Sequence, residues 1–161
     1  MRKIFLIFFC VFMAFLGEFF LFNLAGRWFM PNLLLLTIIY FNLAFGIRFS
    51  ILAAVLAGLL KDGFSADVFG LNIFAFVVAA YMTTFLKRYL HYVASRRSRL
   101  LLVFFVITVN ILTLSGLHVM LEKIDPGEIF RFVFIPETVV TLLVTSFVFL
   151  QLRKCASRLF V

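Results

Sequence analysis

Short clusters of charge divide the chain into long apolar runs, and this pattern constrains the fold more than any other feature. Six apolar segments can be read along the sequence, at residues 4–22, 31–45, 50–60, 71–86, 100–121 and 132–152. A water-soluble domain of 161 residues could not bury the apolar surface of a chain that is 65% hydrophobic, because small domains leave much of their surface exposed. The sequence therefore predicts an all-α integral membrane protein of about six transmembrane helices, folded as a single domain over residues 1–161.

Three of these segments are short for a membrane crossing. About 20 apolar residues are needed to cross the hydrocarbon core, and segments 31–45, 50–60 and 71–86 contain fewer. Neighbouring helices, flanking residues or a locally thinner bilayer would have to compensate. Segments 31–45 and 50–60 could instead form a re-entrant hairpin, which would leave four full crossings. The first segment follows a basic start, as a secretory signal does, but it continues to Phe22 without a small-residue cleavage site, so we expect it to be retained.

The distribution of Lys and Arg predicts the orientation, because cytoplasmic loops of membrane proteins carry an excess of these residues. With a cytoplasmic N-terminus, 11 of the 15 fall inside, at positions 2, 3, 48, 87, 88, 96, 97, 99, 153, 154 and 158, and the other four fall outside, at 27, 61, 123 and 131. We therefore expect a protein of the bacterial inner membrane with both termini in the cytoplasm.

The longest cytoplasmic loop, residues 87–99, is strongly basic. One interpretation is an anchor on anionic lipids, and the other is a docking site for a cytoplasmic partner. The net charge of +8 does not indicate nucleic-acid binding, since the charges are split among short loops and no nucleic-acid-binding motif accompanies them.

Ionisable residues inside apolar segments are candidates for function, because an unpaired charge at mid-bilayer is costly. Glu18 lies late in the first segment and Glu137 early in the last, so both are expected at a similar depth in the outer part of the membrane. His118, near the end of the fifth segment, is expected close to that level. These three side chains form either a polar site for a partner helix or a ligand, or an internal structural cluster that could include Arg27.

Small residues in the third segment predict a close contact between helices. Ala53 and Ala57 are four residues apart, as are Ala54 and Gly58, and each pair therefore lies on one helix face. Ala75 and Ala79 form a weaker face of this kind in the fourth segment.

Signatures of enzymes are absent from the sequence. It contains no HExxH, GxSxG, P-loop or dinucleotide-binding pattern, and its two cysteines, Cys10 and Cys155, lack the spacing of a metal site. We expect neither catalysis nor a metal or other cofactor.

One block of sequence resembles a known family. It begins with Pro31-Asn32-Leu33-Leu34-Leu35-Leu36, continues with Gly58-Leu59-Leu60-Lys61-Asp62-Gly63-Phe64-Ser65 and ends with Phe69-Gly70-Leu71-Asn72. Together with Pro136 in the last segment, the basic tail and the six-segment layout, this block resembles the rod shape-determining protein MreD family.

The resemblance implies a non-catalytic scaffold subunit of the bacterial cell-elongation machinery. Members of the family associate with the bitopic membrane protein MreC and help to connect the MreB cytoskeleton to peptidoglycan synthases. The family is also similar in architecture to the substrate-binding subunits of energy-coupling-factor vitamin transporters. A module that binds a small molecule such as a vitamin is therefore the alternative function.

Asp62, Gly70 and Asn72 are expected to stabilise the outer turn between the third and fourth segments. Asn72 is predicted to cap the start of the fourth segment, and Asp62 is predicted to accept hydrogen bonds from the backbone of the turn.

Overall fold

The chain forms a bundle of helices, seen here in a computed structural model that describes residues 2–25, 31–64, 68–89, 96–122 and 135–160. These residues contain six helices and no strand: α1 (Arg2–Ala25), α2 (Leu33–Phe45), α3 (Ile47–Phe64), α4 (Leu71–Tyr89), α5 (Arg96–Glu122) and α7 (Ile135–Phe160). Four stretches are long and apolar enough to cross a membrane: Lys3–Leu24, Leu71–Tyr89, Arg97–Leu121 and Pro136–Cys155. The prediction of an all-α membrane protein with about six helices is confirmed.

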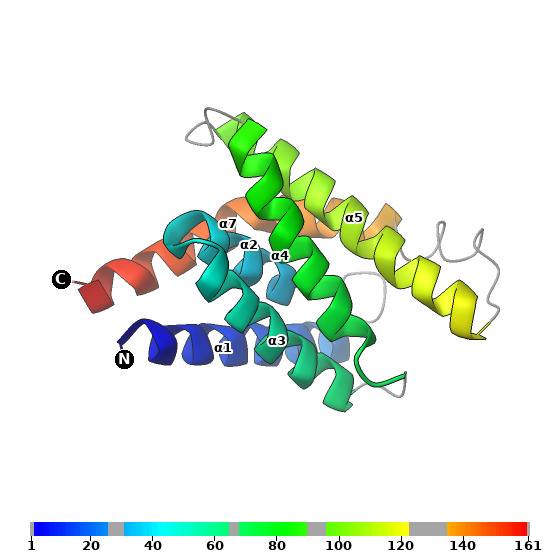
Figure 1. The fold of residues 1–161 in the computed structure, drawn as a ribbon. Coiled ribbons are helices and arrows are strands. Elements are labelled where there is room, and N and C mark those ends of the chain that lie inside the picture. Colours follow the sequence, from blue (N-terminus) through cyan, green and yellow to red (C-terminus); the bar gives the residue numbers. More distant parts are fainter. Residues whose placement is uncertain (1, 26–30, 65–67, 90–95, 123–134, 161) are drawn as a thin grey trace.

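Helix α2 lies in the middle of the bundle (Figure 1). It contacts α1, α3, α4, α5 and α7, and eight of its 13 residues are buried. At about 1.5 Å per residue it is about 20 Å long, which is short of a hydrocarbon core of about 30 Å. The neighbouring helices therefore shield α2 from lipid along most of its length. A single residue, Gly46, separates α2 from α3, and its φ of 89° lies in the region that favours glycine.

The contact between α3 and α4 is the most extensive one between any two of the described helices. The alanines predicted to lie at helix contacts, Ala53, Ala54 and Ala57 of α3 and Ala75 and Ala79 of α4, are fully buried. A Cβ atom on Gly58 would lie 2.5 Å from Ile73 Cα, so no side chain fits at this position. The close contact predicted from the small residues is confirmed.

Several helices extend beyond the apolar segments of the sequence. The third segment, expected to end at Leu60, continues as α3 to Phe64, and most of the loop expected at 87–99 belongs to α4 and α5. Both expectations were wrong for one reason: charged residues such as Lys61 and Lys87 end an apolar run without ending the helix. A helix satisfies its own backbone hydrogen bonds, so it can continue past the hydrocarbon core. Residues 90–95 and 132–134 of the expected elements lie outside the described residues.

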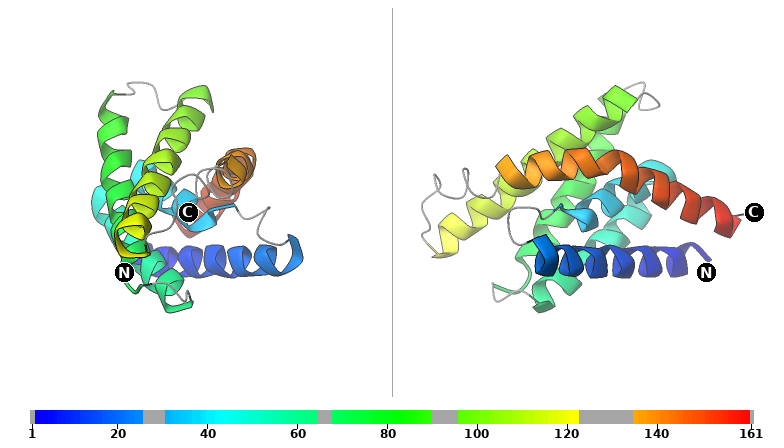
Figure 2. Two further views of the ribbon diagram at one scale, coloured as in Figure 1. Left: turned by 90° about the vertical axis from the view of Figure 1, so that its right-hand side faces the viewer. Right: turned by 180° about the vertical axis from the view of Figure 1, so that it is seen from behind.

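The two ends of the bundle carry opposite charges. At one end α1 begins, α7 ends and α2 meets α3, toward the left in Figure 1; we call it the basic end, and it carries Arg99 and Arg153. The ends of α1, α3 and α5 and the starts of α4 and α7 lie toward the opposite end (Figures 1 and 2). We call this the acidic end, because it carries Glu18, Asp62 and Glu137.

Candidate functional site

The start of α2, at the acidic end, is tied to α7 by Asn32. This residue immediately precedes α2, and its Oδ1 accepts a hydrogen bond from Leu35 N at 3.0 Å, as an N-cap residue does. Its side-chain amide donates to Glu137 Oε1 at 2.8 Å, and its backbone N–H donates to Thr141 Oγ1 at 3.0 Å. Asn32 therefore provides an acceptor for a backbone N–H group of α2 and at the same time binds two side chains of α7.

Glu18 reaches the same helix start from α1. Its Oε1 accepts a hydrogen bond from Leu34 N at 2.8 Å, and Leu34 N is one of the first N–H groups of α2, which have no acceptor within the helix. The side chain is only 3% exposed. Its carboxyl group lies at the positive end of the α2 dipole. The fold itself therefore supplies the partners of this buried acid.

The structure brings Glu18 and Glu137 to one helix start, consistent with the similar depth predicted for them. Each accepts a hydrogen bond there, Glu18 from the backbone of Leu34 in α2 and Glu137 from the side chain of the N-cap residue Asn32. They differ in exposure, because Glu18 is buried and Glu137 is half-buried. The geometry shows a structural use for both acids, and their expected role toward a partner stays a prediction.

His118 and Arg27 were the other candidates for this cluster. His118 Nδ1 lies 2.9 Å from Leu114 O, one turn earlier in α5, and its place in the polar cluster stays a prediction. Arg27 lies outside the described residues. Pro136 occupies the first turn of α7, a position that suits proline because the N–H it lacks has no acceptor there.

The start of α4 is held by Asp62, near the end of α3. Its carboxylate accepts hydrogen bonds from the backbone N–H groups of Gly70, Asn72 and Ile73, at 3.0, 3.1 and 3.2 Å, and from Asn72 Nδ2 at 2.8 Å. Asp62 is 4% exposed, and the φ of 102° at Gly70 lets the turn fold back toward it. The backbone hydrogen bonds expected of Asp62 are present. Asn72 was expected before α4 as its cap, but it lies in the first turn and donates its amide to Asp62.

Further polar side chains join helices in the middle of the bundle. Asn42 of α2 donates to Ala80 O at 2.8 Å and to Thr84 Oγ1 at 2.9 Å, both in α4. Ser50 of α3 donates to Ile38 O of α2 at 3.1 Å. Lipid offers no partner to such groups, so each bond fixes one helix against another. The sequence analysis did not single these residues out, and a neutral polar residue within an apolar run was the only available signal.

The chemistry of the acidic end is that of helix capping. Its buried carboxylates accept hydrogen bonds from backbone N–H groups, which stabilises the starts of α2 and α4. Within the described part of the chain, no group of three or more His, Cys, Asp or Glu side chains could hold a metal ion.

The sequence as a whole matches one family model, that of the rod shape-determining protein MreD, over residues 1–155. This chain belongs to the MreD family. The family resemblance seen in the sequence is thereby confirmed, and the protein has a role in determining rod shape. No curated protein and no solved structure matches the chain.

The residues that carry the MreD resemblance occupy positions that hold the bundle together. Asn32 and Asp62 fix the starts of α2 and α4, and Asn72 binds Asp62. Gly58 allows α3 to approach α4, and Gly70 provides the positive φ before α4.

Proposed function

We propose that this MreD-family chain is a non-catalytic scaffold of the bacterial cell-elongation machinery. It binds an MreC-like bitopic membrane protein and, through it, helps to connect the MreB cytoskeleton to peptidoglycan synthases. The observation that supports a scaffold is the shortness of the connections: the longest, between α5 and α7, has 12 residues, 123–134. A folded domain needs about 50 residues. No connection between these helices is long enough to form such a domain. The helical region of the chain therefore acts through helix faces and short loops.

The proposed setting is the inner membrane with both termini in the cytoplasm. The excess of Lys and Arg at one end supports this orientation, and α1 begins at the same end of the bundle at which α7 ends (Figure 1). Reporter fusions at the C-terminus and near Arg96 should give cytoplasmic signals, and fusions at Asp67 and Asp125 should give periplasmic ones. A periplasmic C-terminus would overturn this orientation.

Partner binding is tested by co-purification from detergent. The tagged chain, co-expressed with an MreC-like protein, should retain it, whereas an unrelated single-span protein of similar length should be lost in the wash. Depletion of the chain in a rod-shaped cell should give rounded cells that the wild-type chain restores. Failure to retain the partner, combined with thermal stabilisation by one compound of a vitamin panel, would favour the small-molecule alternative.

Glu137 is the better of the two acids for locating the partner, because it is half-buried whereas Glu18 is buried. The Glu137→Gln variant should keep the melting temperature but lower the yield of co-purified partner by about two- to fivefold, the range of a partly exposed charge pair. Glu18→Gln, at the same helix start, is the matched control and should leave partner yield per folded protein unchanged. Equal partner yields in both variants would place the interface away from Glu137.

A further inference from the structure

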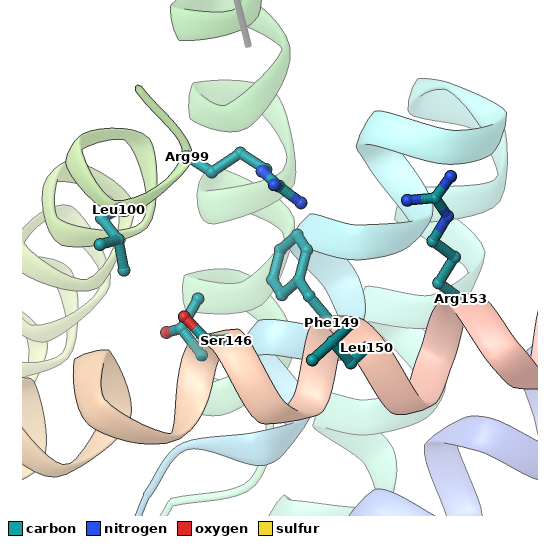
Figure 3. Close-up of a pocket in the computed structure, with 7 residues that line it drawn as sticks. Arg99, Leu100, Ser146, Phe149, Leu150 and Arg153 are labelled. Atoms are coloured by element: carbon teal, nitrogen blue, oxygen red, sulfur yellow. The ribbon is translucent and has the colours of Figure 1, made fainter. Parts of the chain in front are cut away.

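A cavity of about 290 Å³ lies between α5 and α7 at the basic end (Figure 3). Arg99 of α5 and Arg153 of α7 line it, together with Ser146, Phe149 and Leu150 of α7. Its volume is close to the lower limit of small-molecule sites, about 300 Å³. The cavity therefore has room for one compact polar group beside an apolar wall.

The two arginines present their guanidinium groups on the same side of α7. Arg99 extends from α5 over the ring of Phe149, and Arg153 stands one turn further along α7 (Figure 3). Arg99 Nε is buried and has no hydrogen-bond partner among the described residues. Guanidinium groups have the planar, forked geometry that suits phosphate and carboxylate oxygens. The site therefore lacks an acceptor that its geometry is built to receive.

Among the described residues, no acidic side chain pairs with either arginine of this site. The seven Asp and Glu of the chain are at positions 18, 62, 67, 122, 125, 128 and 137, so none lies between 68 and 121 or beyond 137. Along α5, residue 122 is 23 positions from Arg99, and along α7, Glu137 is 16 positions from Arg153. These separations correspond to about 34 and 24 Å. The described part of the chain therefore supplies no counter-anion to the two arginines.

The cavity lies at the level expected of lipid headgroups. The two membrane spans end at Arg97 and Cys155, each two residues from an arginine of the site, or about 3 Å along the helix. Leu150, which lines the cavity, is 59% exposed. The cavity is therefore continuous with the lipid-facing surface of α7.

We propose that this cavity binds the phosphate of an anionic glycerophospholipid. Arg99 and Arg153 bind the phosphate oxygens, and Leu150 contacts the start of an acyl chain. The bound lipid joins α5 to α7. This is a site with a defined stoichiometry, in contrast to a diffuse attraction between basic loops and the membrane surface, and it does not depend on the proposed scaffold function.

Native mass spectrometry of the full chain in detergent tests the proposal, with phosphatidylglycerol as the ligand and phosphatidylcholine as the neutral-headgroup control. The wild-type chain should retain one phosphatidylglycerol in preference to phosphatidylcholine. Arg99→Gln and Arg153→Gln should each weaken that binding by about fivefold, the effect of one basic residue near an anionic headgroup. Arg153 is exposed, so its variant should fold normally even if Arg99→Gln does not.

Arg97→Gln is the matched control for Arg99→Gln. It removes the same charge from an exposed position of α5, two residues from Arg99. It should change phosphatidylglycerol affinity by less than about twofold. An equal loss in Arg97→Gln, or equal retention of phosphatidylcholine, would show diffuse attraction and overturn the site. Inorganic phosphate that competes at the lipid's own concentration would show a soluble-anion site, and displacement of the lipid by an acidic peptide of a partner would show a protein-binding site. Either result would also overturn the proposal.

Discussion

Helices α2 and α4 both begin at the acidic end, and a carboxylate from the preceding helix binds the start of each. The two starts differ in how many side chains share the hydrogen bonds. At the start of α4, Asp62 alone accepts four hydrogen bonds. At the start of α2, Glu18 accepts one, while Asn32 caps the helix and binds Glu137 and Thr141 of α7. A single side chain thus organises the first site, and several helices share the second. One substitution should therefore do much more damage at α4 than at α2.

The largest effect is expected for Asp62→Ala. It leaves three backbone N–H groups and one amide at the start of α4 without their acceptor, and the loss of a buried charged partner costs about 3–5 kcal/mol. The melting temperature and the folded yield in detergent should both fall sharply. Asp62→Asn, which keeps one acceptor oxygen, should recover part of the loss. A wild-type melting temperature in Asp62→Ala would contradict the role assigned to this carboxylate.

Gly58→Ala tests the contact that brings Asp62 to α4. The new methyl group would meet the backbone of Ile73 at 2.5 Å, so α3 and α4 must separate, at a cost of about 1–3 kcal/mol. Gly63→Ala is the matched control in the same helix, because a Cβ there meets nothing within 4 Å. Thermal unfolding should show a lower melting temperature for Gly58→Ala and no decrease for Gly63→Ala. Equal melting temperatures would mean that the helices can shift without strain.

Glu18→Ala should have a smaller effect than either change at the start of α4. It removes the acceptor of Leu34 N, worth about 1–2 kcal/mol, but the Asn32 cap and its bonds to α7 remain. Glu18→Gln keeps an acceptor oxygen and should lie between the wild type and Glu18→Ala. If Glu18→Ala unfolds the protein as thoroughly as Asp62→Ala, the two helix starts are equally dependent on one residue, and the comparison fails.

The smallest effect is expected for Thr141→Val, which removes the acceptor of the Asn32 backbone N–H at the start of α2. Loss of one such neutral bond costs about 0.5–1.5 kcal/mol. Thr108→Val serves as the control, since the Thr108 hydroxyl bonds only within α5 in the described contacts, to Phe104 O. Denaturation curves should separate the two variants, and coincident curves would remove Thr141 from the α2 anchor.

Contacts between nearby residues were readable from the sequence, and contacts between distant ones were not. Asp62 and Asn72 are ten residues apart, so a turn between two apolar segments was enough to predict that Asp62 accepts bonds there. Asn32 and Thr141 are 109 residues apart. Nothing in the sequence around Thr141 indicates that its hydroxyl accepts a hydrogen bond from Asn32. The sulfur atoms of Cys10 and Cys155 are likewise 3.9 Å apart, although neither position carries a signal in the sequence.

Hydropathy predicted the number of helices better than their ends. The change from apolar to charged residues marks the limit of the hydrocarbon core, whereas the end of a helix depends on where its backbone groups find partners. For this reason α3 passes beyond Lys61 to Phe64. Arg99 was grouped with a basic loop for the same reason, and only the packing of α5 beside α7 shows that it shares a cavity with Arg153.

The single residue between α2 and α3 leaves the connection no slack. Each residue inserted or deleted at Gly46 would turn α3 by about 100° about its axis and move it by about 1.5 Å. Gly58 would then leave its place opposite Ile73, and Asp62 would point away from the start of α4. Relatives that keep this packing should therefore tolerate length changes in the other connections but none here. The length of this connection, and not only the residue in it, therefore sets the rotation of α3 about its axis, and the contacts of α3 with the rest of the bundle depend on that rotation.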